Sequence, residues 1–171
     1  MLFRSAYRGF DVRLFQHKGL KVFNLGSSAQ TPIQSYILLT RYIDELNPKL
    51  IVYDVYPETF SIDGVESALD VVSNDKNDFL SLNMIFELNN IKLYNTYIYS
   101  LLLDLKGDKI KYQEPIRKKN DTYIPGGYVQ KDLMTLQLEK SDTNLFISDR
   151  QVSYFKKIIH LVDKKIGRAH V

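Results

Sequence analysis

Apolar residues recur along this 171-residue chain with two spacings, which predict a strand, a helix and a second strand near its start. The apolar runs at 20–25 and 50–56 fit short buried strands, and the second run is rich in β-branched residues. Between them, apolar residues recur at helical spacing in 32–46, with Thr31 as a cap and Pro32 in the first turn. This order predicts a right-handed βαβ unit in which the two runs are parallel neighbours in one sheet.

The remaining patterns predict helices and turns. Asp11 is a suitable cap for a short helix, which Gly19 closes. Residues 63–105 have a mixed, mainly helical pattern. Residues 106–129 are charged and rich in turn formers, with Pro125–Gly127 at their apex.

A last helix is predicted to begin at Ser148 and Asp149. Its apolar face consists of Val152, Phe155, Ile158, Ile159 and Val162. We therefore expect one α/β domain with a parallel sheet. A mixed helical and turn-rich insertion, at about 61–145, separates its second strand from its last helix.

The two ends of the chain encode one oligonucleotide and its complement. Leu2–Ser5 can be written CTC TTC CGA TCT, whose reverse complement is AGATCGGAAGAG. Read after a lysine codon and continued with the usual short-read sequencing adapter, that complement encodes residues 166–171. We expect residues 1–5 and 166–171 to be translated adapter. The native segment is then 6–165, a gene fragment cut at both ends.

Composition and charge exclude several classes of protein. With 44% hydrophobic residues the chain can bury one sizeable core, and without Cys it has no disulfides, thiolate zinc sites or Cys nucleophiles. No stretch has the roughly 18 uncharged apolar residues of a membrane span. The net charge of +3 falls to +1 without Arg4 and Arg168, and basic residues alternate with acidic ones. No nucleic-acid partner is expected.

The histidines give no sign of a metal site. His17 lies at a predicted helix end and His160 lies beside the apolar face of the last helix. Neither has an acidic residue at the spacing of a metal motif, so we expect no metal and no cofactor. A Ser-His-Asp triad stays open because triads assemble in space, although neither context favours one.

The strongest candidate site is the run of small residues within VFNLGSSAQTP, at 22–32. It joins a predicted strand to a predicted helix, which is how backbone N–H groups are presented at the edge of a sheet. Its candidate residues are Asn24, Gly26, Ser27, Ser28 and Ala29. The two serines could act as nucleophiles. The simpler interpretation is that they are turn residues, because the loop has neither the G-x-S-x-G elbow nor the lysine of a phosphate-binding loop.

Two other groups of polar side chains need an interpretation. Asp54 and Glu58, at the end of the second predicted strand, are a possible polar site or else a helix cap and a surface ion pair. The tyrosines Tyr94, Tyr97 and Tyr99 are expected to pack in the core and not to form a sugar platform.

Residues 6–60, from AYRGFD to VYPETF, resemble bacterial SGNH-hydrolase-like proteins. These are relatives of the GDSL esterases and include the DltD-like and the cell-wall or exopolysaccharide O-acyltransferase branches. The resemblance implies a three-layer, flavodoxin-like fold with a parallel sheet, incomplete here. It also implies that Asn24–Thr31 is the oxyanion-side loop, with Ala29 where many members have glycine. Val55–Glu58 replaces the family's Gly-x-Asn-Asp block, so the asparagine donor is missing.

The family's catalytic blocks have no match in this sequence. The nucleophile block would precede Ala6, where Ser5 belongs to the expected adapter, and nothing before Lys165 matches Asp-x-x-His. No catalytic residue is retained. We expect an inactive fragment of a serine ester hydrolase or O-acyltransferase acting on acylated glycans or cell-envelope polymers. The resemblance implies an extracytoplasmic, membrane-tethered parent. The alternatives are a non-catalytic binding or accessory module on the same fold and a nucleotide-binding domain.

Overall fold

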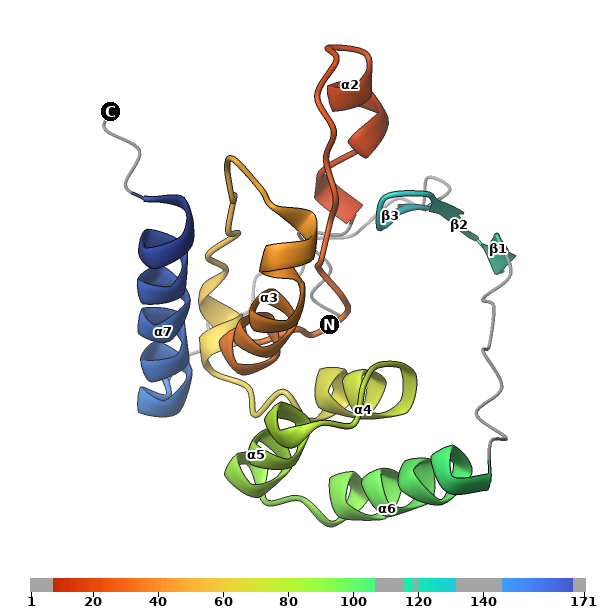
Figure 1. Cartoon of the computed structure of the whole chain (residues 1–171), viewed down its shortest axis with the longest axis vertical. Helices are drawn as coiled ribbons and strands as arrows, with labels where there is room; N and C mark the ends of the chain where they lie inside the picture. The colour runs from red at the N-terminus through yellow and green to blue at the C-terminus, as the bar shows by residue number, and fades with distance from the viewer. Residues whose placement is uncertain (1–7, 107–115, 119, 132–145, 168–171) are drawn as a thin grey trace.

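The computed structural model describes residues 8–106, 116–118, 120–131 and 146–167, and this part of the chain is mainly helical (Figure 1). Its helices are α2 (Val12–Gln16), α3 (Pro32–Leu46), the 3-10 turn η1 (Pro57–Phe60), α4 (Val65–Asn74), α5 (Phe79–Leu88), α6 (Ile91–Lys106) and α7 (Asp149–Ile166). Its strands are β1 (Arg117–Lys118), β2 (Asp121–Ile124) and β3 (Tyr128–Lys131), in the order β1-β2-β3. Both pairs in this small sheet are antiparallel.

The predicted flavodoxin-like parallel sheet is wrong. Residues 20–25 and 50–56 are not strands. The sheet among the described residues consists of β1, β2 and β3, at 117–131, and its neighbouring strands are antiparallel. A strand exists only where a second strand exchanges hydrogen bonds with it, and β-branched composition does not supply that partner. In the described part of the chain, the backbone of 50–55 makes no backbone hydrogen bond.

Two helices follow the sequence closely: the one in the middle of the predicted βαβ unit and the last one of the chain. α3 begins after Thr31, whose N–H donates to the side chain of Gln34 at 3.0 Å, and ends at Asn47 in a left-handed conformation. α7 begins after Ser148, whose N–H donates to the carbonyl of Phe60 at 2.9 Å. Both helices are as predicted, because caps and helical spacing are local signals.

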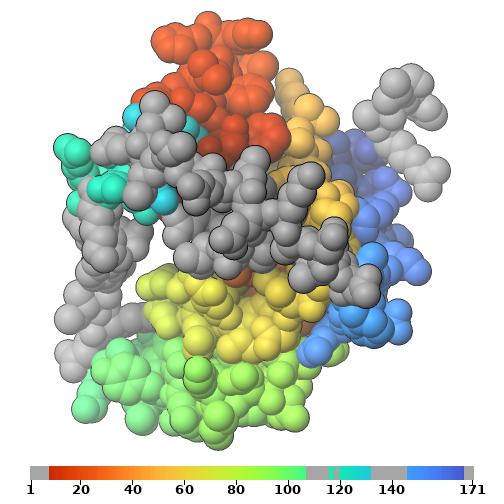
Figure 2. All heavy atoms as spheres, turned by 180° about the vertical axis from the view of Figure 1, so that it is seen from behind, coloured from red at the N-terminus to blue at the C-terminus, as the bar shows by residue number. Residues whose placement is uncertain are grey.

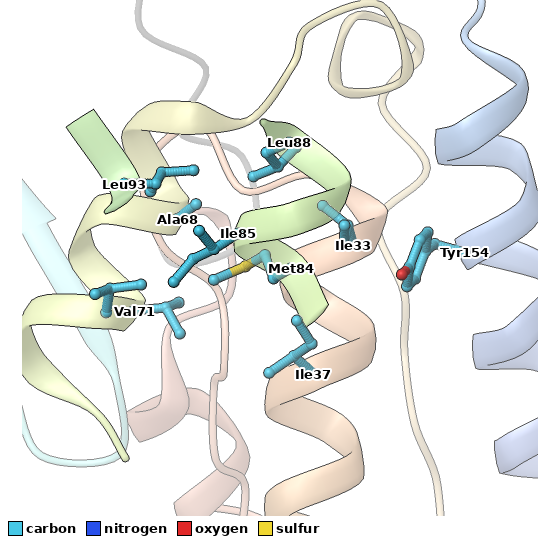
Figure 3. Packing of buried hydrophobic residues seen from close by; sticks show 10 residues of the cluster. Ile33, Ile37, Ala68, Val71, Met84, Ile85, Leu88, Leu93 and Tyr154 are labelled. Carbon is cyan, nitrogen blue, oxygen red and sulfur yellow. The ribbon is translucent and has the colours of Figure 1, made fainter. Parts of the chain in front are cut away.

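A large buried cluster joins four helices to α7 (Figure 3). Its members are Ile33, Ile37, Ala68, Val71, Val72, Met84, Ile85, Leu88, Leu93 and Tyr154. Most of them come from α4, α5 and α6, so the region expected to be an insertion supplies much of the core. Tyr94 and Tyr97 pack against this cluster as predicted, whereas Tyr99 is 63% exposed and the prediction is wrong for it.

A smaller buried cluster shows what the apolar runs at 20–25 and 50–56 pack against. Leu39 and Ile43 of α3 and Ile158 of α7 are buried together, and Leu25, Ile51 and Tyr53 pack against them. Other apolar side chains of the same runs are exposed, namely Leu20, Phe23, Leu50, Val52 and Val55. Each run is therefore covered only in part, and neither is the buried strand that the sequence predicted.

One cation fixes α3 to the connection between α4 and α5. The side chain of Arg41 is 3% exposed and donates to Asp75 at 2.7 Å and to Asp78 at 2.5 Å and 3.0 Å. It also donates to the hydroxyl of Ser81 at 2.7 Å. Tyr42 donates to Asp75, and burial together with that hydrogen bond raises the pKa of Tyr42 to about 12.

Candidate functional site

The loop before α3 is shaped by a local hydrogen bond and one unusual backbone conformation. The side-chain oxygen of Asn24 accepts from the N–H of Gly26 at 2.9 Å, which closes a tight turn. Ala29 has a φ of 51°, in the left-handed region that glycine adopts without strain. Ala29 is also buried, so the turn at Ser28–Ala29 is held against the body of the protein.

The first backbone donors of α3 are occupied by the chain itself. The N–H of Thr31 donates to Gln34, and the N–H of Ile33 donates to the side-chain oxygen of Gln151 at 3.3 Å. Pro32 has no N–H. Gln34 and Gln151 are themselves fully buried and donate to the carbonyls of Gly64 and Ile62. The start of α3 is therefore closed to a ligand by buried glutamine side chains.

The donors that stay available lie one turn earlier. The backbone N–H groups of Ser27, Ser28 and Ala29 form no hydrogen bond with any other described residue. Successive N–H groups in a turn that contains a left-handed residue can converge on one anionic or carbonyl oxygen. This is the chemistry that an oxyanion site requires.

The side chain of Ser27 belongs to a chain of hydrogen bonds. Its hydroxyl donates to the side-chain oxygen of Gln30 at 2.9 Å and lies 3.2 Å from the hydroxyl of Ser67. Gln30 donates onward to the hydroxyl of Ser35 at 2.9 Å. Burial raises the pKa of Tyr53. No imidazole or carboxylate touches Ser27 in this network, so nothing in it activates the hydroxyl as a nucleophile.

The predicted acidic residues and histidines lie apart from this network. Asp54 is half-buried, and Glu58 lies in η1 with one carboxylate oxygen buried and without a hydrogen-bond partner among the described residues. Burial and the nearby Glu58 charge raise the pKa of Tyr56. His17 is the C-cap of α2 and His160 lies on α7, and both are exposed. Neither histidine is hydrogen-bonded to a serine of the loop.

The hairpin of β2 and β3 reaches the first residue of the loop, which the sequence did not predict. The N–H of Asn24 donates to the carbonyl of Gly126 at 2.8 Å. Gly127 has a φ of 86°, and a Cβ there would lie 2.1 Å from the carbonyl oxygen of Asn24. The sequence indicated a turn at these two glycines. It did not indicate their contact with Asn24, which lies about a hundred residues away along the chain.

One ion pair and one hydrogen bond from an arginine hold the hairpin against the N-terminal segment, beside which it lies in both views (Figures 1 and 2). Arg8 donates two hydrogen bonds to Asp121, at 2.8 Å and 3.1 Å. Arg13 donates to Asp11 and also to the side-chain oxygen of Gln130 at 2.9 Å. The hydrogen bond from Arg13 lowers the pKa of Asp11 against the opposing effect of burial. The hairpin is thereby positioned to fix Asn24.

The described ranges contain no group of three His, Cys, Asp or Glu side chains that could hold a metal ion. None of the helices described is both long and apolar enough to cross a membrane.

No known protein family, curated protein or solved structure matches this chain. The resemblance to SGNH-hydrolase-like proteins therefore stays a prediction from the residues of 6–60.

Proposed function

We propose that the loop Asn24–Ala29 binds the carbonyl or anionic oxygen of an acyl group. In this proposal the chain is the oxyanion side of an SGNH-type serine ester hydrolase or O-acyltransferase for acylated glycans or cell-envelope polymers. The observation that carries it is the set of N–H groups at Ser27, Ser28 and Ala29, which no described residue engages. The N–H groups of Thr31 and Ile33, at the start of the adjoining helix, are engaged by glutamine side chains and do not offer such donors.

The same geometry argues that the chain does not cleave an ester by itself. Acyl transfer to serine needs a base within hydrogen-bond reach of the hydroxyl. The hydroxyl of Ser27 is engaged with Gln30 and Ser67, and His17 and His160 lie on exposed faces of other elements. Donors without a nucleophile and base bind an oxygen but give little acceleration.

A second candidate function is a non-catalytic binding or accessory module. It is favoured by the network from Ser27 through Gln30 and Ser35, because that network uses the serine as a structural group. Under this alternative the loop holds an acylated ligand, and no larger enzyme supplies chemistry to it.

Calorimetric titration with an acetylated xylo-oligosaccharide tests the binding that both functions share. We expect heat of binding with the acetylated sugar and none with the same sugar after deacetylation. Ala29→Gly keeps the left-handed turn and should keep binding, whereas Ala29→Val strains it and should weaken binding at least about tenfold. Equal heats for the two sugars would refute recognition of the acyl group.

Hydrolysis of p-nitrophenyl acetate tests the absence of chemistry. The chain should release nitrophenol no faster than buffer. Turnover that disappears in Ser28→Ala would show that the loop contains a nucleophile and that both versions of the proposal are wrong.

A further inference from the structure

Helix α6 turns one face to the core, and its opposite face has no partner among the described residues. Leu93 and Ser100, seven residues apart, are its buried residues. In Figure 1 the helix lies along one edge of the molecule, with α4 and α5 on its inner side. A helical face that points away from every neighbouring element is normally polar.

The outer face of α6 is apolar instead. Ile91, Ile98, Leu102 and Leu105 have exposed fractions between 52% and 84%. Together with exposed Asn95 they follow one another at intervals of four, three, four and three residues, which is the seam of a coiled coil. We call these five residues the α6 seam. On a soluble protein, a contiguous apolar stripe of this kind marks an interaction surface.

The apolar surface continues from the α6 seam onto α5. The ring of Phe86 lies 6.1 Å from that of Tyr94, edge to face, and Phe86 and Phe79 are both exposed. Lys92 and Lys106 are the basic residues of α6, and Asp104 is its acidic residue. None of these charged residues is a member of the seam, and the two lysines are the sequence neighbours of its end residues Ile91 and Leu105.

Asn95 identifies the partner. It is the polar member of the seam, and its side chain forms no hydrogen bond with another described residue. An asparagine covered by an apolar partner loses water and needs both a donor and an acceptor. In a parallel, in-register pair of α6 helices, Asn95 meets its own copy, and the two amides satisfy each other. In an antiparallel pair it would meet isoleucine or leucine.

We propose that α6 docks in parallel on α6 of a second copy of this chain, with the two Asn95 side chains facing each other. The 16-residue helix is about 24 Å long and its contact face roughly 10 Å wide. That is well below the roughly 800 Å² per partner of a stable interface, even before the phenylalanines of α5 are added. The dimer is therefore concentration-dependent.

Disulfide trapping tests the proposal cleanly because the chain has no cysteine. Asn95→Cys should become a covalent dimer on mild oxidation at about 100 µM protein. Ser153→Cys, an exposed serine on α7, is the matched control and should stay monomeric. Equal cross-linking of the two variants would mean that the disulfide forms by random collision, and it would overturn the proposal.

Sedimentation velocity of the unmodified chain gives an independent readout. The mass should rise from one copy toward two between about 5 and 500 µM, and Ile98→Glu should hold it at one copy. Ser153→Glu should leave the rise unchanged. A monomer at every concentration would overturn the proposal. An antiparallel dimer would also overturn it: in that case a mixture of Ile91→Cys and Leu105→Cys would form the disulfide, and Asn95→Cys would not. Monomers that sediment with anionic phospholipid vesicles and lose this through Ile98→Glu would assign the seam to a membrane surface.

Discussion

Arg41 is the charged residue on which the packing of three helices depends. Its side chain is almost fully buried yet meets two carboxylates and a hydroxyl, so its charge is compensated at every contact. A buried cation with these partners contributes mainly through the penalty that follows when one partner is removed. No local pattern predicts this cluster, because Asp75 and Asp78 lie more than thirty residues from Arg41.

Replacing Arg41 by methionine should lower the free energy of unfolding by about 3 kcal/mol, because Asp75 stays close to the core without its cation. Urea denaturation followed by circular dichroism measures this. Arg13→Met, which removes an arginine whose side chain is 43% exposed, is the control and should cost less than about 1 kcal/mol. Equal losses would mean that the Arg41 cluster is not buried in solution.

The same cluster makes stability depend on acid. Partial burial raises the pKa of Asp78. The hydrogen bonds from Arg41 and from the N–H of Ser81 lower it by more than burial raises it, so the net pKa is below its usual value. The unfolded chain then binds protons more readily than the folded chain. The contribution is fully present above about pH 4 and is lost as pH falls through the folded pKa.

Urea titrations between pH 6 and pH 3 should therefore show a falling free energy of unfolding. In Asp78→Asn the fall should be shallower, because that carboxylate no longer takes up a proton on unfolding. A slope unchanged by the substitution would place the acid sensitivity elsewhere.

Gly127 shows how one backbone position fixes the hairpin to the candidate site. Gly127→Ala should lower the free energy of unfolding by more than about 2 kcal/mol, since its Cβ would collide with the backbone of Asn24. Gly19 also has positive φ, 74°, but open space around it, so Gly19→Ala should cost only about 1 kcal/mol. Thermal unfolding compares the two variants, and equal costs would contradict the close approach of hairpin and loop.

At the scale of elements, the sequence predicted helices well and pairing poorly. Thr31 and Pro32 begin α3, and Asp11 caps α2 through the N–H of Arg13, because these signals act within a few residues. Whether 20–25 and 50–56 pair depends on distant chain, and β-propensity reports only that such residues fit a half-buried surface. The small residues of the loop Asn24–Ala29 identified it as a candidate site in the sequence. The sequence did not predict that Gln34 and Gln151 close the start of α3.

The segment 50–56 offers a test of this difference. Ile51 faces the smaller cluster and Val52 is 67% exposed. Ile51→Ala should lower the free energy of unfolding by about 2 kcal/mol, and Val52→Ala should change it by less than about 0.5 kcal/mol. Chemical denaturation measures both. A large loss for Val52→Ala would mean that the segment is covered on both sides, as a central strand is.

At the scale of the whole molecule, the described helices cover part of each apolar run and hold the loop between the two runs. α3 joins both clusters, so the turn at its start is anchored to α4 through Gln34 and to α7 through Gln151. The hairpin fixes the other end of the loop through Asn24. A loop held at both ends keeps in one arrangement the N–H groups of Ser27, Ser28 and Ala29, which no other described residue engages. Recognition of an oxygen without reorganisation requires such an arrangement.

The most direct test of this account is residue-resolved. In an ¹⁵N-labelled sample titrated with the acetylated xylo-oligosaccharide, the amide resonances of Ser27, Ser28 and Ala29 should shift together and saturate. The amides of Thr31 and Ile33, already bonded to Gln34 and Gln151, should move far less. Saturating shifts confined to other parts of the chain, with these three amides unmoved, would contradict the assignment of the loop as the oxygen-binding site.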